Sequence, residues 1–135
     1  MGQPILAVEH LQVCYTGKPV LEDVSLTIEP GQILGIVGES GSGKSTLIKA
    51  AMGLLDSDGA VTGGRILYKD QDITALRGEE LRRLRGPQMG MIFQNTGASL
   101  CPIRTIQDQL FEAVLQHEKI SRQEIRERAW NCLIK

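Results

Sequence analysis

Apolar and polar residues alternate through the first part of the chain, as they do in a half-buried strand. The apolar positions change parity between Leu6 and Leu11, which predicts a strand with a bulge or break near His10. After a turn at residues 16–19 the alternation resumes over residues 24–28. Two alternating segments joined by a short turn predict an antiparallel sheet at the start of the chain.

Two short apolar runs, residues 33–37 and 89–93, show no alternation. Such runs are typical of strands that are buried on both faces of a parallel sheet. Between them, apolar residues recur at helical spacing over 47–55, an edge strand or hairpin is predicted over 64–73, and a polar helix is predicted over 76–85. This order of elements predicts an α/β fold.

The chain beyond Gln94 shows only the helical period. One amphipathic helix is predicted from near Thr105, and a capping box of Ser121 and Glu124 opens a second one. No helix-ending residue precedes Lys135. We therefore expect the chain to be a truncated, N-terminal portion of a longer protein, cut inside a helix.

Composition narrows the classes of function. The 135 residues are the size of one domain, and 15 basic against 16 acidic side chains give a net charge of −1, too balanced for a protein that holds nucleic acid mainly by charge. The 3 cysteines have no Cys-x-x-Cys spacing, which indicates neither a disulfide framework nor a zinc site. No apolar run approaches the roughly 18 residues of a membrane span.

Residues 38–45 match the phosphate-loop pattern G-x-x-x-x-G-K-[ST]. They are Gly38, Glu39, Ser40, Gly41, Ser42, Gly43, Lys44 and Ser45. The pattern stands between a predicted buried strand and a predicted helix, which is the context that it requires. Backbone N–H groups hold a polyphosphate in such a loop, so the chain must turn with positive φ angles, which the three glycines allow.

The residues that open the predicted helix supply the remaining chemistry. Lys44 is predicted to bridge the β- and γ-phosphates of ATP and to act in catalysis, and Ser45 to place its hydroxyl on Mg²⁺. Thr46 is a candidate contact of the α-phosphate. The positive end of the helix dipole faces the same anion. ATP and Mg²⁺ are therefore the expected cofactors, and a glycine-rich turn with an exposed lysine is the alternative.

An aromatic residue before the phosphate loop and a glutamine after the second apolar run extend this pattern. With Tyr15 and Gln94 in these places, the chain resembles the ATP-binding subunit of an ABC transporter. The resemblance implies that Tyr15 binds the cofactor by stacking on adenine. It also implies that Gln94 is the Q-loop glutamine, which approaches Mg²⁺ and the attacking water and signals to the membrane subunits.

A narrower resemblance is carried by the sequences LRRLRG at 81–86, MIFQ at 91–94, SLCP at 99–102 and TI at 105–106. They are similar to the dipeptide, oligopeptide and nickel importer branch, which usually reads I-F-Q-D-P, S-L-N-P and T-I-G. This chain departs from that pattern at Asn95, Thr96, Cys101 and Gln107. The departures leave the ATPase class intact and the solute, of peptide or metal type, open.

The resemblance also implies an architecture and a set of partners. The nucleotide-binding core, a P-loop NTPase core with an N-terminal antiparallel β subdomain, would occupy residues 1–94, and residues 95–135 would start a helical subdomain. Such a subunit lies peripherally at the cytoplasmic face of the cell membrane against transmembrane permease subunits, and a solute-binding protein serves it indirectly. Two subunits, identical or different, sandwich two ATP molecules.

Hydrolysis in the family needs a strand of four apolar residues ending in Asp-Glu, an LSGGQ-like motif and a histidine on a later strand. These 135 residues contain none of them, since His10 and His117 stand elsewhere. We therefore expect the front half of an importer ATPase, with a naturally truncated nucleotide-binding module that hydrolyses nothing as the alternative. A small-molecule kinase of the P-loop class is less favoured, because it has no reason to place Tyr15 and Gln94 as they stand.

Overall fold

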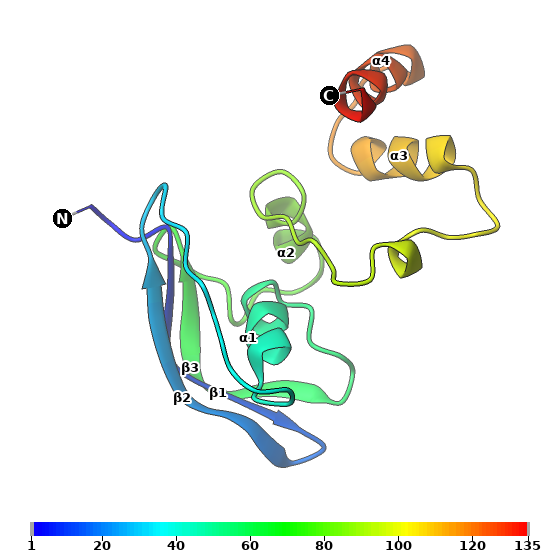
Figure 1. Ribbon diagram of the computed structural model, residues 1–135. Coiled ribbons are helices and arrows are strands. Elements are labelled where there is room, and N and C mark those ends of the chain that lie inside the picture. The colour runs from blue at the N-terminus through cyan, green and yellow to red at the C-terminus, as the bar shows by residue number, and fades with distance from the viewer. Residues whose placement is uncertain (1, 135) are drawn as a thin grey trace. The chain divides into compact units, whose positions relative to one another are not determined.

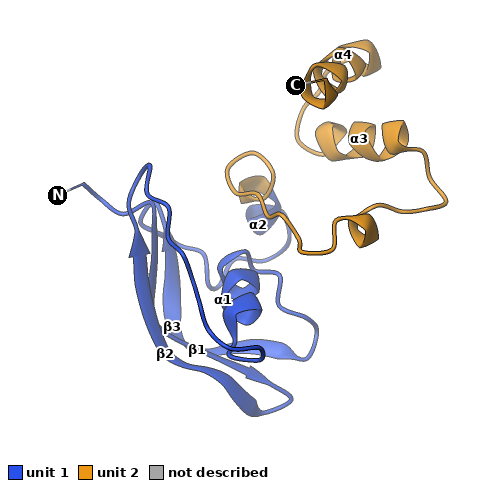
Figure 2. Cartoon of the chain, viewed as in Figure 1, with its two compact units in different colours: residues 1–82 blue, residues 83–135 orange. Residues whose placement is uncertain are grey.

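The computed structural model describes residues 2–134. Backbone contacts group the chain into two compact units, Met1–Arg82 and Arg83–Lys135 (Figure 2). Unit 1 holds the sheet and the phosphate loop, and unit 2 holds two longer helices. No helix within residues 2–134 has both the length and the apolar character needed to cross a bilayer.

The sheet of unit 1 is antiparallel and has the strand order β2-β1-β3-β4 (Figure 1). Its strands are β1 (Leu6–Tyr15), β2 (Lys18–Ile28), β3 (Gly59–Tyr68) and β4 (Gln71–Asp72). The antiparallel sheet predicted for the start of the chain is thus confirmed, and so is the hairpin predicted over residues 64–73. Strand β3 adds to the free side of β1, so that β1 is a central strand.

The bulge predicted near His10 is also confirmed. The register of β1 against β2 shifts between Val8 and Leu11, and His10 has a φ of 49°. On the other side of β1, Gly64 of β3 has a φ of 76° and lies so close that a Cβ there would collide with the carbonyl groups of Glu9 and His10. The bulge therefore depends on a glycine in the neighbouring strand.

Helix α1 (Lys44–Ala51) contacts β1 and β2, and apolar side chains from the sheet and the helix form the core of unit 1. The buried members of that core include Val8, Leu11, Val13, Leu21, Ile66, Leu47 and Ala50. The helix predicted over 47–55 is therefore present and faces the sheet, but it ends at Ala51, and residues 52–55 lie outside it. The polar helix predicted over 76–85 is α2 (Gly78–Leu84), whose Leu81 and Leu84 are buried as the spacing of its apolar residues indicates.

The two strands predicted over residues 33–37 and 89–93 do not form, and this is the main correction to the sequence-based fold. Both segments are irregular, and Ile33, Val37 and Ile92 are 97%, 94% and 92% exposed. A strand needs a neighbouring strand for its backbone N–H and C=O groups, and within residues 2–134 neither segment pairs with a strand of the sheet. Met89 forms an isolated bridge with Arg85, which does not extend along the segment. An apolar run shows that a segment can be buried, but the partner strand decides whether it is.

Unit 2 contains the 3₁₀ turn η1 (Gly97–Ser99) and the helices α3 (Ile106–Leu115) and α4 (Arg122–Leu133), as predicted for the chain beyond Gln94. The Ser121 hydroxyl accepts a hydrogen bond from the Glu124 N–H at 3.2 Å, which confirms the predicted cap. Phe111 and Ile125 are buried between the helices, whereas Leu133 is 70% exposed. The predicted apolar face of α4 is therefore only partly covered.

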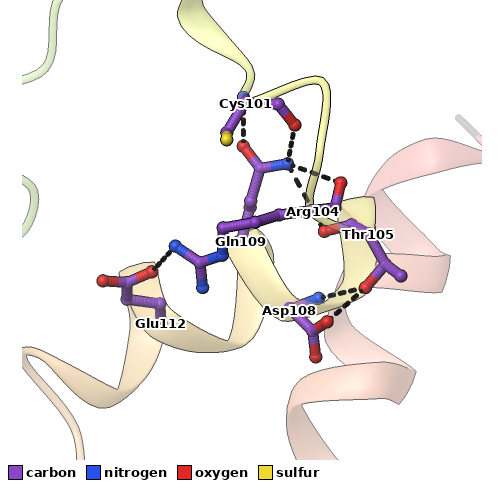
Figure 3. A network of polar contacts seen from close by, with 6 residues as sticks. All are labelled: Cys101, Arg104, Thr105, Asp108, Gln109 and Glu112. Atoms are coloured by element: carbon purple, nitrogen blue, oxygen red, sulfur yellow. Dashed lines mark hydrogen bonds and ion pairs between the residues drawn. The ribbon is translucent and has the colours of Figure 1, made fainter.

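A side-chain amide holds together the loop before α3, as Figure 3 shows. The Gln109 Oε1 accepts from the Cys101 N–H at 2.8 Å, and its Nε2 donates to the Cys101 carbonyl at 3.0 Å and to the Arg104 carbonyl at 3.2 Å. Thr105 caps the same helix by accepting from the Asp108 N–H at 3.1 Å. One glutamine thus replaces the backbone partners that this irregular loop lacks.

Replacing Gln109 by alanine should destabilise unit 2 by about 1–2 kcal/mol, because the half-buried Cys101 N–H loses its acceptor. The Cys101 carbonyl keeps the Arg104 N–H as a donor at 3.3 Å. Hydrogen exchange measured at the Cys101 amide should become faster. Gln107→Ala is the matched control, since Gln107 is exposed and its side chain accepts one long hydrogen bond, from Arg126 at 3.4 Å, among residues 2–134. Equal exchange at Cys101 in the two variants would show that the amide does not hold the loop.

Candidate nucleotide-binding site

The phosphate loop has the backbone conformation that the sequence predicts. Gly41 and Gly43 have φ angles of 82° and 90°, and Gly43 is the N-cap of α1. The first hydrogen bond of the helix runs from the Leu47 N–H to the Gly43 carbonyl at 2.9 Å. No side chain caps the helix, and its first turn contains no acidic residue. The N–H groups at this end therefore point to an anion as their partner.

The Lys44 ammonium lies over the loop that precedes it. Its Nζ donates to the Gly38 carbonyl at 2.7 Å, to the Glu39 carbonyl at 2.5 Å and to the Ser42 hydroxyl at 3.2 Å. Three oxygens of the loop thus hold one positive charge at the open end of the helix. Phosphate oxygens of a bound polyphosphate can take the place of these acceptors, since each contact is a charge-assisted hydrogen bond to oxygen.

Packing on the sheet side also requires glycine in this loop. A Cβ at Gly43 would lie 2.7 Å from Leu21 Cδ2 and 3.2 Å from the Val20 carbonyl of β2. A Cβ at Gly38 would lie 2.7 Å from the Ser42 hydroxyl. Gly43 therefore lies against β2, where there is no room for a side chain. Successive backbone N–H groups of glycine-rich loops are the groups that cradle phosphate.

The remaining predicted cofactor ligands stand at the same end of the helix. Ser45 is exposed in the first turn of α1, Thr46 beside it is half-buried, and Glu39 and Ser40 are exposed in the loop. Residues 2–134 contain no cluster of three or more His, Cys, Asp or Glu side chains placed to hold a metal. A Mg²⁺ ion at Ser45 would therefore take most of its ligands from phosphate oxygens and water, which suits the ion's preferences.

Tyr15 ends β1 and lies at a junction that the sequence analysis missed. It is paired with Gly59 across β1 and β3, and its hydroxyl donates to Asp56 Oδ2 at 3.3 Å. The Lys49 ammonium binds the same Asp56 carboxylate at 2.9 Å and 3.2 Å. A carboxylate and a glycine just beyond the helix predicted over 47–55 give no local sign of an aromatic partner.

The negative charge of Asp56 is paired with the positive charge of Lys49. The hydrogen bond from Lys49 lowers the pKa of the Asp56 carboxyl below its ordinary value, and the same bond raises the pKa of the Lys49 ammonium. Both groups stay ionised at neutral pH. Because the pair is solvent-exposed, it sets the place of the two side chains more than it stabilises the fold.

Gln94, the predicted Q-loop residue, belongs to unit 2, whereas the phosphate loop belongs to unit 1. It is exposed and lines a hollow with Phe93, Asn95, Ala98 and Ser99. Asn95, a departure from the importer pattern, accepts from the Ala98 N–H at 3.3 Å and so helps to form η1. The structure thus gives Asn95 a local structural role beside Gln94.

Comparison with known proteins agrees with this geometry. Residues 21–133 match the family model described as ABC transporter. The dipeptide transport ATP-binding protein DppD of Bacillus subtilis is 40% identical over 97% of this chain and 41% of its own length. The probable D,D-dipeptide transport ATP-binding protein DdpD of Escherichia coli is 38% identical over 98% of this chain and 42% of its own length. The chain therefore spans about two fifths of these relatives.

A solved structure is similar over nearly the whole chain. It is the dimer of an ATP-binding cassette in a post-hydrolysis state with ADP and phosphate bound, and it matches 95% of this chain and 55% of its own with a TM-score of 0.75 and 25% identity. A second, the ADP conformation of an ATP-binding cassette of an ABC transporter, is 34% identical over 62% of this chain, with a TM-score of 0.52.

Proposed function

Since the chain belongs to the ABC transporter family, we propose that it is the ATP-binding part of a subunit that powers the import of peptides. The observation that carries the proposal is the phosphate loop, in which an uncapped helix end and the Lys44 ammonium meet over glycines with positive φ. This combination of backbone N–H donors and one ammonium group suits a triphosphate. The two relatives named for dipeptide transport support the peptide class of solute.

Each residue of the site has a separate part in binding. Lys44 exchanges its loop acceptors for β- and γ-phosphate oxygens, Ser45 binds Mg²⁺, and Thr46 contacts the α-phosphate. Tyr15 stacks on adenine. By the family's pattern, Gln94 would act on Mg²⁺ and the attacking water. Bound Mg²⁺ neutralises charge on the phosphates, and the protein contributes the positions of these groups.

The partners follow from the same proposal. Residues 1–94 form the nucleotide-binding core and residues 95–135 open the helical subdomain, which meets the permease. A second ATP-binding subunit completes each site, and the pair lies at the cytoplasmic face of the membrane. ATP turnover belongs to this dimer of whole subunits, because positioning and charge stabilisation of the transferred phosphoryl group need groups from both.

Replacing Tyr15 by alanine tests the assignment of the base site. We expect Mg-ATP to bind the full chain more weakly by roughly 1–3 kcal/mol, the range for loss of a base–aromatic stack. Isothermal titration calorimetry gives the affinity directly. Trp130→Ala is the control, since Trp130 is an exposed aromatic residue of unit 2. Unchanged affinity in the Tyr15 variant would remove Tyr15 from the site.

A further inference from the structure

The Tyr15 ring lies over a gap in the opposite strand. Gly59 is its partner in the β1–β3 pair, and a Cβ there would lie 2.8 Å from Tyr15 Cζ and 2.9 Å from Cε1. Any larger residue at this position would therefore displace the ring. An aromatic side chain that covers a cross-strand glycine is a known way to pin a strand pair, and here it also defines the plane of the ring.

The tip of the same ring is tied to the far end of helix α1. Asp56 accepts from the Tyr15 hydroxyl at 3.3 Å, and Lys49, in the last turn of the helix that Lys44 opens, holds the carboxylate at 2.9 Å. The ammonium contact is the shorter one, so Lys49 anchors Asp56, and Asp56 in turn holds Tyr15. One short helix thus carries the phosphate-binding lysine at one end and the anchor of the aromatic ring at the other.

We propose that Asp56 is a positioning residue for nucleotide binding, which holds the Tyr15 ring in the orientation that receives the base. The proposal rests on the proposed function, in which Tyr15 stacks on adenine. A tyrosine side chain without such restraints samples several rotamers, and ordering it on binding costs affinity. With Gly59 beneath the ring and Asp56 at its hydroxyl, that ordering is already present before the nucleotide arrives.

The ion pair with Lys49 makes this arrangement compatible with an anionic ligand. An isolated carboxylate near the site would repel a triphosphate, whereas Asp56 carries a cation at hydrogen-bond distance. The site thereby gains a fixed hydrogen-bond acceptor for Tyr15 at little electrostatic cost. Asp58, two residues on, has no such contact with Tyr15 among the described hydrogen bonds, and it serves as a charge-matched control.

The test compares a ligand that has a base with one that has none. Affinities for Mg-ATP and for Mg-tripolyphosphate are measured by calorimetry on the full chain and on Asp56→Ala, Asp58→Ala, Tyr15→Phe and the double variant Tyr15→Phe/Asp56→Ala. We expect Asp56→Ala and Tyr15→Phe each to bind Mg-ATP about three- to tenfold more weakly, as for the loss of one hydrogen bond, with tripolyphosphate affinity unchanged. The double variant should be no weaker than either single one.

The outcomes separate this inference from the proposed function. Equal Mg-ATP affinity in Asp56→Ala and Asp58→Ala would overturn the positioning role while leaving ATP binding intact. An equal loss for ATP and tripolyphosphate would overturn it too, because the effect would then be general to the site. If the wild-type chain binds Mg-ATP no more tightly than Mg-tripolyphosphate, the base adds no affinity. The stacking role of Tyr15 is then wrong, and so is the positioning role of Asp56.

Discussion

Replacing Lys44 by alanine should reduce Mg-ATP affinity by at least about 3 kcal/mol, or more than about a hundredfold, the largest functional effect expected for one residue here. The Nζ makes three hydrogen bonds within the loop and is the cation placed at the uncapped end of α1. Its loss removes charge-assisted bonds to two phosphates together. Titration of the full chain with Mg-ATP measures the change.

Two further variants sharpen this result. Lys119→Ala removes a lysine of unit 2 and should leave affinity unchanged. Lys44→Arg keeps the charge but should not restore binding, because a planar guanidinium cannot occupy the same small cage of three oxygens. Binding of Mg-ATP by folded Lys44→Ala with wild-type affinity would refute the assignment of the phosphate loop.

Replacing Gly64 by alanine should be the most destabilising of the glycine substitutions, at about 3 kcal/mol or more. The new Cβ would add a left-handed backbone penalty of about 1–2 kcal/mol to an overlap with main-chain atoms of Glu9 and His10. Main-chain carbonyls in the middle of a paired strand cannot move away as a flexible side chain can. Urea unfolding followed by circular dichroism gives the free-energy difference.

The control for this substitution is Gly17→Ala in the turn between β1 and β2. Gly17 has a φ of 77°, nearly the same as the 76° of Gly64, but nothing lies within 4 Å of its Cβ position. Only the left-handed backbone penalty of about 1–2 kcal/mol should then appear. If the two variants unfold at the same urea concentration, the close approach of β3 to the bulge does not matter for stability.

Much of the local structure was predictable because it depends on residues close together in the sequence. The turns, the glycines of the phosphate loop and the cap at Ser121 each follow from a few neighbouring residues. The same is true of α3, whose N-cap and apolar period lie within its own segment. The hydrogen bonds and backbone preferences that form such elements lie within a few residues of each other in the sequence.

The junction around Tyr15 could not be predicted in this way. It joins the end of β1, the last turn of α1 and the start of β3. The sequence of any one of these segments does not predict that it contacts the other two. The Gln109 amide in unit 2 is a similar case, because a polar residue inside a helix is usually solvated, and only the folded loop shows its backbone partners.

The amino-acid sequence alone indicated the family, through the phosphate-loop pattern and the places of Tyr15 and Gln94 around it, because nucleotide chemistry needs particular residue types at fixed spacing. Tertiary structure decided which apolar segments are covered: residues 33–37 and 89–93 have the composition of buried strands, yet they are irregular and largely exposed. The reason is physical. Apolar character is a property of the segment itself, whereas a strand exists only with a neighbour whose backbone groups pair with its own.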